Sequence, residues 1–466
     1  MKTVLELLNA GKPRAALARL KKLLAETDDD SEWRIHELFG ATFHDLCNAE
    51  GVAQSYFNAA MTDKFLRSQR GHFSNYLFAL HYLPQLDAET LANELAVYNS
   101  LYVNADTLPK ITRPITGKIS VAFIAPTFCY SSAAGFFESL LTDYNREKFK
   151  VTTWSISDEE DAFTEKIRRS VDGYFTLDKV SFADAAQMIR DAAVDILIDL
   201  GGHTEGGTTL QIAAYKPARL QISGIGYFDS TGLDAIDYFI GDEFLTAEDT
   251  TFTEKVLSLK NVFALRPNEK MIAERVARKK IPHENFTFGC LNNFMKLSND
   301  YLDAVKNILT AVPNSKIIFR DTTPLESRRR ELIERLNIFG IDCAEVRLGE
   351  DDFYGDYDEI DLILDTFPYT GGMMTALALY MGVPVVNMCG NLAATRTGAD
   401  ILRITEISEM ICTNVDDYVA TAVDIARDGT RLKTLAAKIS ADKLTDTKSF
   451  VEDFYGKILT CEELRS

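Results

Sequence analysis

The stretch "DLILDTFPYTGGMMTALALYMGVPVV", residues 361–386, carries the strongest fold signal in the chain. An apolar run ends in a turn that contains Pro368, Gly371 and Gly372, an apolar helical segment follows, and a second apolar run occupies 383–388. Two short apolar runs joined by a helix are typical of a βαβ unit, in which the strands are parallel. The stretch therefore predicts one repeat of a parallel α/β sheet.

Two series of such alternations lie on either side of a charged segment at 265–285. Strands are expected at 119–126, 149–156, 194–200 and 219–228 in the first series, and at 286–293, 316–321, 344–350, 361–367 and 383–388 in the second. Ligands of open parallel sheets bind at the carboxyl ends of the strands. The pattern therefore predicts two Rossmann-like halves that face one cleft.

The N-terminal part of the chain has helical periodicity. Gly40, Phe43, Tyr56 and Ala59 fall at the spacing of small and aromatic positions in a tetratricopeptide hairpin, although a generic helical bundle fits nearly as well. Ser31, in the polar break at 28–33, is a candidate helix cap, and 104–118 reads as a linker. The expected domains are a helical, tetratricopeptide-like domain (1–105), two Rossmann-like halves (106–265 and 266–440) and a C-terminal helix (441–466).

Composition excludes several classes of protein. With 50 Lys and Arg against 69 Asp and Glu, the net charge of −19 argues against nucleic acid and anionic membranes as partners. The seven cysteines form no CxxC pair and the six histidines no HxxxH pair, so we expect reduced thiols, a cytoplasmic protein and no metal site. The N-terminus does not resemble a signal peptide, and no run reaches the ~20 apolar residues of a membrane helix.

Polar residues follow two of the predicted strands. His203, in "DLGGHTEGG" (199–207), is either an acid or base at the strand end or a residue that only caps the turn. Asn292, Asn293 and Lys296 follow the strand at 286–293, where a lysine suits a phosphate leaving group. A solvated lysine at a helix start is the competing interpretation.

The turn at 366–375 is a candidate phosphate site. Gly371 and Gly372 precede a helix, and the first N–H groups of a helix attract anions. Thr375 offers a hydroxyl, whereas Met373 and Met374 are apolar and form a wall. A further charge could come from Arg396, near the start of another predicted helix, unless it is a surface residue.

Five segments in order resemble the catalytic region of protein O-GlcNAc transferases, which form glycosyltransferase family 41. They are "DILIDLGGHTEGG", "KPARLQISGIGYFDSTGLDAIDY" (216–238), "FGCLNNFMKLS" (288–298), the stretch at 361–386 and "AATRTGADIL" (393–402). The resemblance covers roughly residues 70–430. It implies an α/β protein of the GT-B type with a helical N-terminal domain. It also implies an inverting, metal-independent transfer of a sugar, usually N-acetylglucosamine, from UDP to Ser or Thr of a protein.

The resemblance also implies roles for individual residues. Lys296 matches the family lysine that stabilises the departing diphosphate, and Asn293 matches a neighbouring donor contact. The glycines at 371–372 and the helix start through Thr375 match the diphosphate cradle, and His203 matches a "GHT" common in bacterial members. No cofactor is implied beyond the UDP-sugar donor, which is a substrate.

The chain departs from the family pattern at several positions. Ser131 and Ser132 stand where members carry a histidine, Phe353 aligns with a second histidine, and Met373 and Met374 replace threonines. Leu377 stands where a carboxylate binds the ribose, and Asp229 is added in "GYFDSTG" as a candidate acceptor-side base.

Three interpretations of these departures stay open within the family. The donor or acceptor differs, the catalytic geometry is rebuilt around Asp229, or the chain is a weakly active or inactive substrate-binding partner of an active paralogue. Outside the family, a nucleotide-sugar epimerase also uses two Rossmann halves. We expect a working transferase whose partners are a UDP-sugar and an acceptor protein, such as flagellin or another cytosolic protein, and a homo-oligomer stays open.

Overall fold

The computed structural model describes residues 1–27, 31–103, 105–247, 251–279, 281 and 284–464. The chain forms two compact units, each built from three separate segments. Unit 1 comprises Met1–Lys64, Ala79–Leu86 and Pro267–Leu444, and unit 2 comprises Phe65–Phe78, Asp87–Arg266 and Thr445–Ser466. The units are therefore interleaved along the sequence, and the predicted boundaries at 105/106, 265/266 and 440/441 stay predictions.

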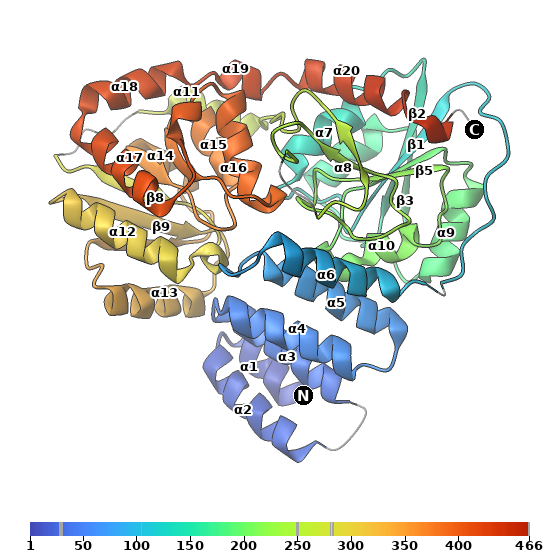
Figure 1. Cartoon of the computed structure of the whole chain (residues 1–466), viewed down its shortest axis with the longest axis horizontal. Helices are drawn as coiled ribbons and strands as arrows, with labels where there is room; N and C mark the ends of the chain where they lie inside the picture. Colours follow the sequence, from blue (N-terminus) through green and yellow to red (C-terminus); the bar gives the residue numbers. More distant parts are fainter. Residues whose placement is uncertain (28–30, 104, 248–250, 280, 282–283, 465–466) are drawn as a thin grey trace. The chain divides into compact units, whose positions relative to one another are not determined.

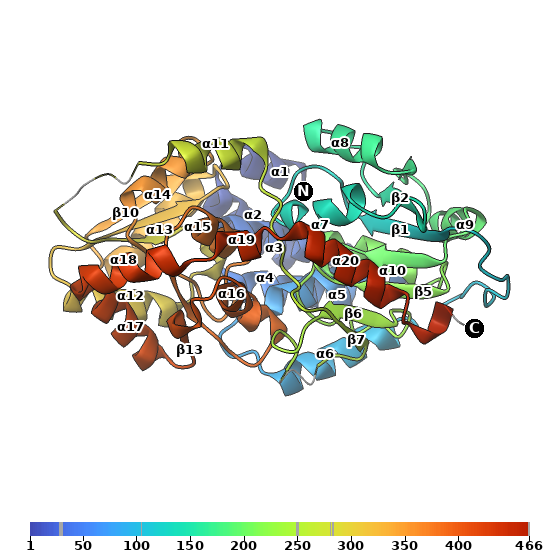
Figure 2. The same ribbon diagram turned by 90° about the horizontal axis from the view of Figure 1, so that it is seen from above.

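Unit 2 contains a seven-stranded parallel sheet with the order β3-β2-β1-β4-β5-β6-β7. Its strands are β1 (Ile119–Ala125), β2 (Phe149–Ser155), β3 (Gly173–Thr176), β4 (Ile196–Asp199), β5 (Leu220–Ser223), β6 (Tyr238–Gly241) and β7 (Lys255–Ser258). Its helices are α6 (Ala88–Ser100), α7 (Ala134–Thr142), α8 (Ala162–Ser170), α9 (Phe182–Asp191), α10 (Thr208–Ala213) and α20 (Thr447–Ile458), with most of α5 (Leu66–Leu80). Helix α7 packs against α8 and against α20, which runs beside it in Figure 2, and α9 packs against α10.

Unit 1 contains a six-stranded parallel sheet with the order β10-β9-β8-β11-β12-β13. Its strands are β8 (Thr287–Cys290), β9 (Lys316–Asp321), β10 (Ala344–Leu348), β11 (Leu362–Leu364), β12 (Val385–Met388) and β13 (Ile411–Cys412). Its helices are α11 (Glu269–Ala277), α12 (Asn299–Ala311), α13 (Glu326–Phe339), α14 (Asp356–Glu359), α15 (Met373–Tyr380), α16 (Ala393–Ile404), α17 (Val415–Arg427), α18 (Gly429–Lys438) and α19 (Ala441–Leu444). Figure 1 shows α12 and α13 on one side of this sheet and α15 and α16 on the other.

The order of unit 1 reverses direction between β8 and β11, and that of unit 2 between β1 and β4. This reversal is the topological switch point of a Rossmann fold, and the loops that leave the two central strands there define the ligand crevice. Both sheets therefore confirm the predicted α/β units in series. The unpredicted strands β3, β6, β7 and β13 lie toward the sheet edges.

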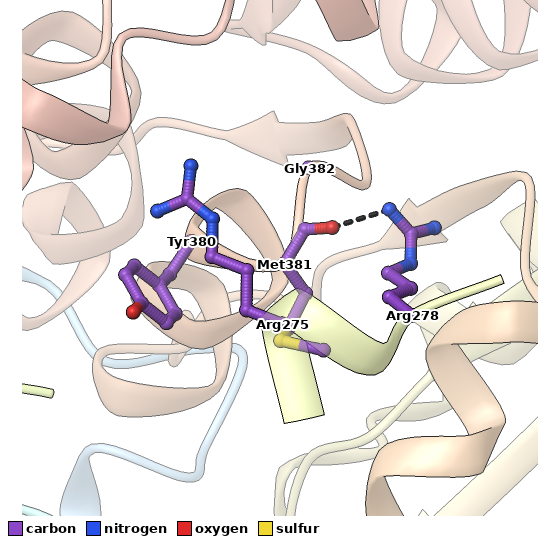
Figure 3. A pocket seen from close by; sticks show the side chains of 5 residues that line it. All are labelled: Arg275, Arg278, Tyr380, Met381 and Gly382. Carbon is purple, nitrogen blue, oxygen red and sulfur yellow. Dashed lines mark hydrogen bonds between the residues drawn. The ribbon is translucent and has the colours of Figure 1, made fainter. Parts of the chain in front are cut away.

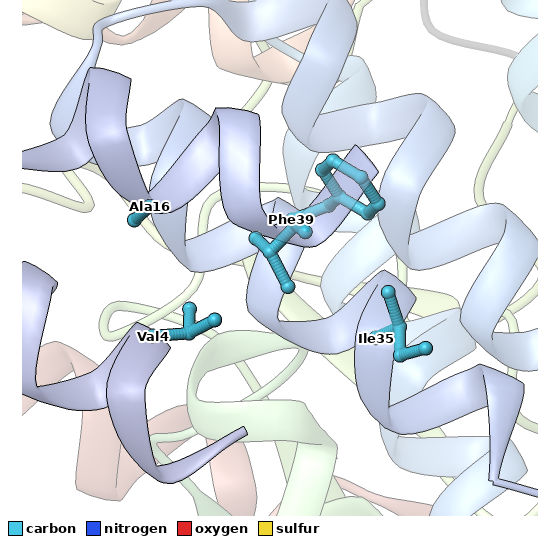
Figure 4. Packing of buried hydrophobic residues seen from close by; sticks show 5 residues of the cluster. Val4, Ala16, Ile35 and Phe39 are labelled. Carbon is cyan, nitrogen blue, oxygen red and sulfur yellow. The ribbon is translucent and has the colours of Figure 1, made fainter. Parts of the chain in front are cut away.

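Unit 1 also contains two antiparallel helical hairpins made by α1 (Lys2–Asn9), α2 (Pro13–Glu26), α3 (Glu32–Asp45) and α4 (Ala49–Thr62). Val4, Ala16, Leu20, Ile35 and Phe39 form their common core, shown in Figure 4. A Cβ built at Gly40 would lie 2.9 Å from the Tyr56 ring, so the missing side chain lets α3 and α4 approach closely. The predicted pairing of small and aromatic positions is therefore present.

Some predicted segments differ in detail. Ser31 stands at the N-cap position of α3, as expected, but its side chain makes no capping hydrogen bond. Asp28–Asp30 lie outside the described residues. So do residue 104 of the expected linker and 280 and 282–283 of the charged segment. The described part of the expected C-terminal helix consists of α19, α20 and a 3-10 turn at Glu462–Leu464.

Candidate functional site

The switch point of unit 1 brings two loops together. Strand β8 pairs with β11, so the loop after β8 and the loop after β11 leave the sheet side by side. The first contains the 3-10 turn Phe294–Lys296, which we call the lysine turn, and the second leads through 365–372 into α15. Lys296 Nζ donates a hydrogen bond to the Thr370 carbonyl oxygen, 2.8 Å away. The lysine side chain therefore lies against the turn that leads to the two glycines, and their joint role as a phosphate site stays a prediction.

Lys296 has an unusual environment for an ammonium group. Its Nζ lies 3.6 Å from the centroid of the Tyr369 ring, and the Tyr82 ring packs against Tyr369 at 5.3 Å. Burial lowers the Lys296 pKa to about 8, although the negative charge of Asp365 opposes that shift. At neutral pH the side chain is thus a partly desolvated cation, which interacts with an anion more strongly than a solvated lysine does.

Asp365 organises the loop after β11. This residue is fully buried, and its carboxylate accepts five hydrogen bonds of 2.8–2.9 Å. The donors are Asn292 Nδ2, the N–H groups of Thr366 and Gly371, the Thr375 hydroxyl and Asn387 Nδ2. The Gly371 N–H and the Thr375 hydroxyl were both predicted to contact a phosphate. In the structure they donate to the Asp365 carboxylate instead.

The start of α15 presents backbone and apolar groups. Helix α15 begins at Met373, and Gly372 occupies its N-cap position without a side-chain cap. Met373 is buried and Met374 half-buried, as expected for walls rather than ligands. The backbone N–H groups at this helix start are the donors that a diphosphate would meet.

Two other residues that were predicted to contact the UDP-sugar form hydrogen bonds within the protein. Arg396, in α16, is 7% exposed, and its Nη1 donates to the Gly390 carbonyl oxygen at 3.2 Å, so it is not a surface residue. Asn293 caps the lysine turn: its Oδ1 accepts hydrogen bonds from the Met295 N–H and from Arg328 Nη1. Contact of either residue with a donor stays a prediction.

His203 lies in unit 2, at the loop after β4, and is fully buried. Its Nε2 is 3.0 Å from the Thr231 carbonyl oxygen, so Nε2 carries the proton, and Nδ1 accepts from the Ser74 hydroxyl at 2.6 Å. Burial lowers the His203 pKa to about 3. Both nitrogens are engaged and the ring is neutral, an environment that favours the structural interpretation over an acid or base.

Asp229 is likewise buried in unit 2, where its Oδ1 accepts a hydrogen bond from the Ser230 N–H at 2.8 Å. Ser230 and Thr231 both donate hydrogen bonds to Glu254, which holds this loop in place. Action of Asp229 as the predicted acceptor-side base would therefore require the loop to open.

A pocket elsewhere in unit 1 is lined by Arg275, Arg278, Tyr380, Met381 and Gly382 (Figure 3). It lies at the C-terminal end of α15, the end opposite the glycine turn. Arg278 Nη1 donates to the Met381 carbonyl oxygen and Nη2 to the Tyr357 carbonyl oxygen. These arginines complement the negative end of the α15 dipole, which explains their presence without a ligand.

The sequence did not predict that Asp365, Tyr369 and Arg328 lie around Lys296. The sequence does contain a signal for Asp365, because this acidic residue comes directly after an apolar run, as Asp199 does in the first half. Among the described residues, no group of three or more His, Cys, Asp or Glu is placed to hold a metal ion. None of the described helices combines the length and the apolar composition needed to cross a membrane.

A family model with the description Glycosyl transferase family 41 matches residues 99–281 and 265–457. The chain belongs to glycosyltransferase family 41. This membership confirms the resemblance drawn from the five ordered segments.

Family 41 relatives include plant proteins. The chain is 30% identical over 397 residues to the probable UDP-N-acetylglucosamine–peptide N-acetylglucosaminyltransferase SPINDLY of Arabidopsis thaliana, covering 82% of this chain and 41% of that protein. It is 24% identical to the probable UDP-N-acetylglucosamine–peptide N-acetylglucosaminyltransferase SEC of the same plant. That match covers 78% of this chain and 40% of SEC. The chain thus spans less than half the length of these relatives.

A solved structure has the same fold. A mutant of the O-GlcNAc transferase of Thermobaculum terrenum superposes with a TM-score of 0.85, covering 98% of this chain and 89% of that chain at 22% sequence identity. The likeness establishes the GT-B type fold with an N-terminal helical region.

Proposed function

We propose that this family 41 chain is an inverting glycosyltransferase that moves N-acetylglucosamine from a UDP-sugar to Ser or Thr of an acceptor protein. The observation that carries the proposal is the position of Lys296 Nζ, which lies at the switch point of unit 1 against Thr370 and beside the start of α15. The names of the plant relatives support the donor and the acceptor class.

The chemistry follows from the charge that develops. The acceptor oxygen attacks the anomeric carbon, the bond from that carbon to the phosphate oxygen breaks, and UDP leaves with its negative charge. Attack opposite the leaving group inverts the configuration. The Lys296 ammonium and the N–H groups at the start of α15 would stabilise the departing diphosphate, and we propose that no metal is needed.

The proposal leaves the acceptor-side base open to experiment. His203 is neutral and internally bonded, and Asp229 is buried, so neither is in contact with solvent in this structure. A cytoplasmic location is also part of the proposal, supported by seven free cysteines, which suit a reducing compartment.

A donor other than UDP-N-acetylglucosamine is the second candidate. The first turn of α15 offers the methionine side chains Met373 and Met374, and Leu377 is 2% exposed at the position where family members bind ribose with a carboxylate. Phe353, at a family histidine position, is 6% exposed and apolar. A weakly active or inactive partner of a paralogue would show the same substitutions and would be recognised by weak or absent transfer.

Two measurements test the proposal. Calorimetry with UDP in the presence of EDTA should show binding, and Lys296→Met should lower sugar transfer, detected by mass spectrometry of acceptor proteins, by roughly 100- to 1,000-fold, the usual cost of removing one group that stabilises developing charge. Lys433→Met, at an exposed position of α18, is the matched control and should keep full activity. Full transfer by Lys296→Met, or absence of UDP binding by the wild type, would reject the proposal. A panel of nucleotide sugars separates the two donor candidates.

A further inference from the structure

The guanidinium group of Arg328, in α13, is fully enclosed near the proposed site. Its side chain is 0% exposed and forms an ion pair with Asp321, with Nη1 2.7 Å from Oδ2. The same Nη1 lies 3.0 Å from Asn293 Oδ1. A buried guanidinium is costly unless acceptors surround it, so these contacts fix its position.

The two acceptors of Arg328 are also the groups that hold the lysine turn. Asp321 Oδ2 accepts the Phe294 N–H at 2.9 Å, and Asn293 Oδ1 accepts the Met295 N–H at 2.9 Å. Lys296 is the last residue of this turn. Arg328 therefore donates to the same two side-chain oxygens, one of a carboxylate and one of an amide, that accept the backbone N–H groups of this turn.

A second arginine of α13 holds the far end of the same loop. Arg335 Nη2 donates to the Leu297 carbonyl oxygen at 2.6 Å and to Asn299 Oδ1 at 3.0 Å. Helix α13 thus contacts the loop at Asn293, three residues before Lys296, and at Leu297, directly after it.

Helix α13 also contacts the N-terminal helices of unit 1. Arg328 Nη2 lies 3.0 Å from Nδ1 of His44, at the end of α3, and His44 is exposed on its other side. Arg14, in α2, pairs with Glu331 at 2.7 Å. The Arg14 pair is largely exposed and adds little. The contact between Arg328 and His44 instead links α3 to the lysine turn through a buried guanidinium.

We infer that Arg328 is a positioning residue for Lys296, and that through Arg328 the helix α3 is mechanically connected to the leaving-group lysine. The inference rests on the proposed function for its catalytic consequence. Its structural part, the placement of the Lys296 ammonium, is measurable without any transfer activity.

The first test measures the pKa of Lys296 directly. Protein with ¹³C-labelled lysine is titrated by NMR, and the Lys296 signal is assigned by its loss in Lys296→Arg. In Arg328→Lys, which keeps the charge but cannot contact Asp321, Asn293 and His44 together, the Lys296 pKa should move from about 8 toward its ordinary value of 10.5. Arg329→Lys, at the exposed neighbouring position, is the matched control and should leave the signal unchanged. An unchanged Lys296 titration in folded Arg328→Lys overturns the inference.

The second test separates positioning from general stability. Arg328→Lys should lower kcat on the order of 10- to 100-fold with a small change in donor KM, because displacement of a catalytic group by about 1 Å costs up to about 100-fold. In a Lys296→Ala background the same substitution should have no further effect on kcat, whereas a purely structural residue would lower the rate equally in both backgrounds. Equal losses in the two backgrounds would overturn the positioning role.

A further variant keeps the test decisive if Arg328→Lys does not fold. His44→Phe preserves an aromatic ring but removes the ring nitrogens as acceptors for Nη2 and leaves only the backbone carbonyl oxygen of residue 44, 3.4 Å away. It should therefore move the Lys296 titration in the same direction by a smaller amount. No movement in His44→Phe would refute the connection to α3. If the lysine signal responds as expected while the wild type transfers no sugar, the proposed function fails and the placement of Lys296 by Arg328 stands.

Discussion

Replacement of Asp365 by Asn tests how the loop after β11 is held. The substitution changes the shape of the side chain little, but it removes the charge and turns one of two acceptor oxygens into an NH2 donor. If the remaining oxygen faces Asn292, Thr366 and Gly371, the new NH2 group faces the Thr375 hydroxyl and Asn387 Nδ2. Two hydrogen bonds to a buried carboxylate are then lost.

The size of the effect follows from those two bonds. Each hydrogen bond to a charged group contributes roughly 1.5–3 kcal/mol, and rotation of the Thr375 hydroxyl recovers part of the loss, so unit 1 should lose about 2–4 kcal/mol. For a domain of this size that free energy lowers the Tm by roughly 4–16 °C. Loss of the Asp365 charge should also lower the Lys296 pKa below its present value of about 8, because that charge now raises it.

Differential scanning fluorimetry and the lysine NMR titration measure these two effects separately. Asp424→Asn, at an exposed position of α17, is the matched control and should change neither. A Tm within about 1 °C of the wild type together with an unaltered Lys296 pKa would show that Asp365 does not organise the site.

Three further predictions use single residues. The proposed transferase should lose kcat above pH about 8 as Lys296 deprotonates, and Lys296→Arg, if active, should lose this falling limb because arginine stays protonated; an identical falling limb in both proteins would assign it to another group. His203 stays neutral in the fold but protonates when unfolded, so stability should fall by ~1.4 kcal/mol per pH unit below about 6.5 on its account. In His203→Gln, the urea midpoint of unfolding should therefore differ less between pH 7 and pH 5 than in the wild type, and transfer activity should be kept. Loss of transfer in a folded variant would make His203 a catalytic candidate again. Gly51→Ala places a Cβ 2.5 Å from the Phe43 ring and should destabilise the α3–α4 hairpin by about 1–3 kcal/mol. Denaturation followed by circular dichroism measures this loss, and an unchanged stability would mean that the Phe43 side chain moves away without cost.

The alternation of apolar runs was sufficient to predict the central strands, because a strand covered by helices on both faces must be apolar throughout. It failed at the edges, where β3 is half-exposed and β13 has only two residues. The run at 361–367 was predicted as one strand, but β11 ends at Leu364 because the Asp365 carboxylate binds the N–H groups of the following turn.

The site could be predicted only in part for a different physical reason. Lys296 and the glycine turn each follow a strand, and the parallel order brings them together. The partners of His203 and Asn293 could not be foreseen in this way. Ser74 is 129 residues from His203, and Arg328 is 35 residues from Asn293, so no local pattern records either contact.

The interleaving of the two units has a consequence for how the chain folds during its synthesis. Met1–Lys64 leaves the ribosome well before Pro267–Leu444, the segment with which it shares unit 1. At ~5–20 residues per second, the intervening residues 65–266 take roughly 10–40 s to translate. During that time the surface of α3 that will meet α13 has no partner. The nascent helical hairpins therefore expose this surface until α13 has been made, and expression of 266–440 alone would leave α13 without the helices it contacts.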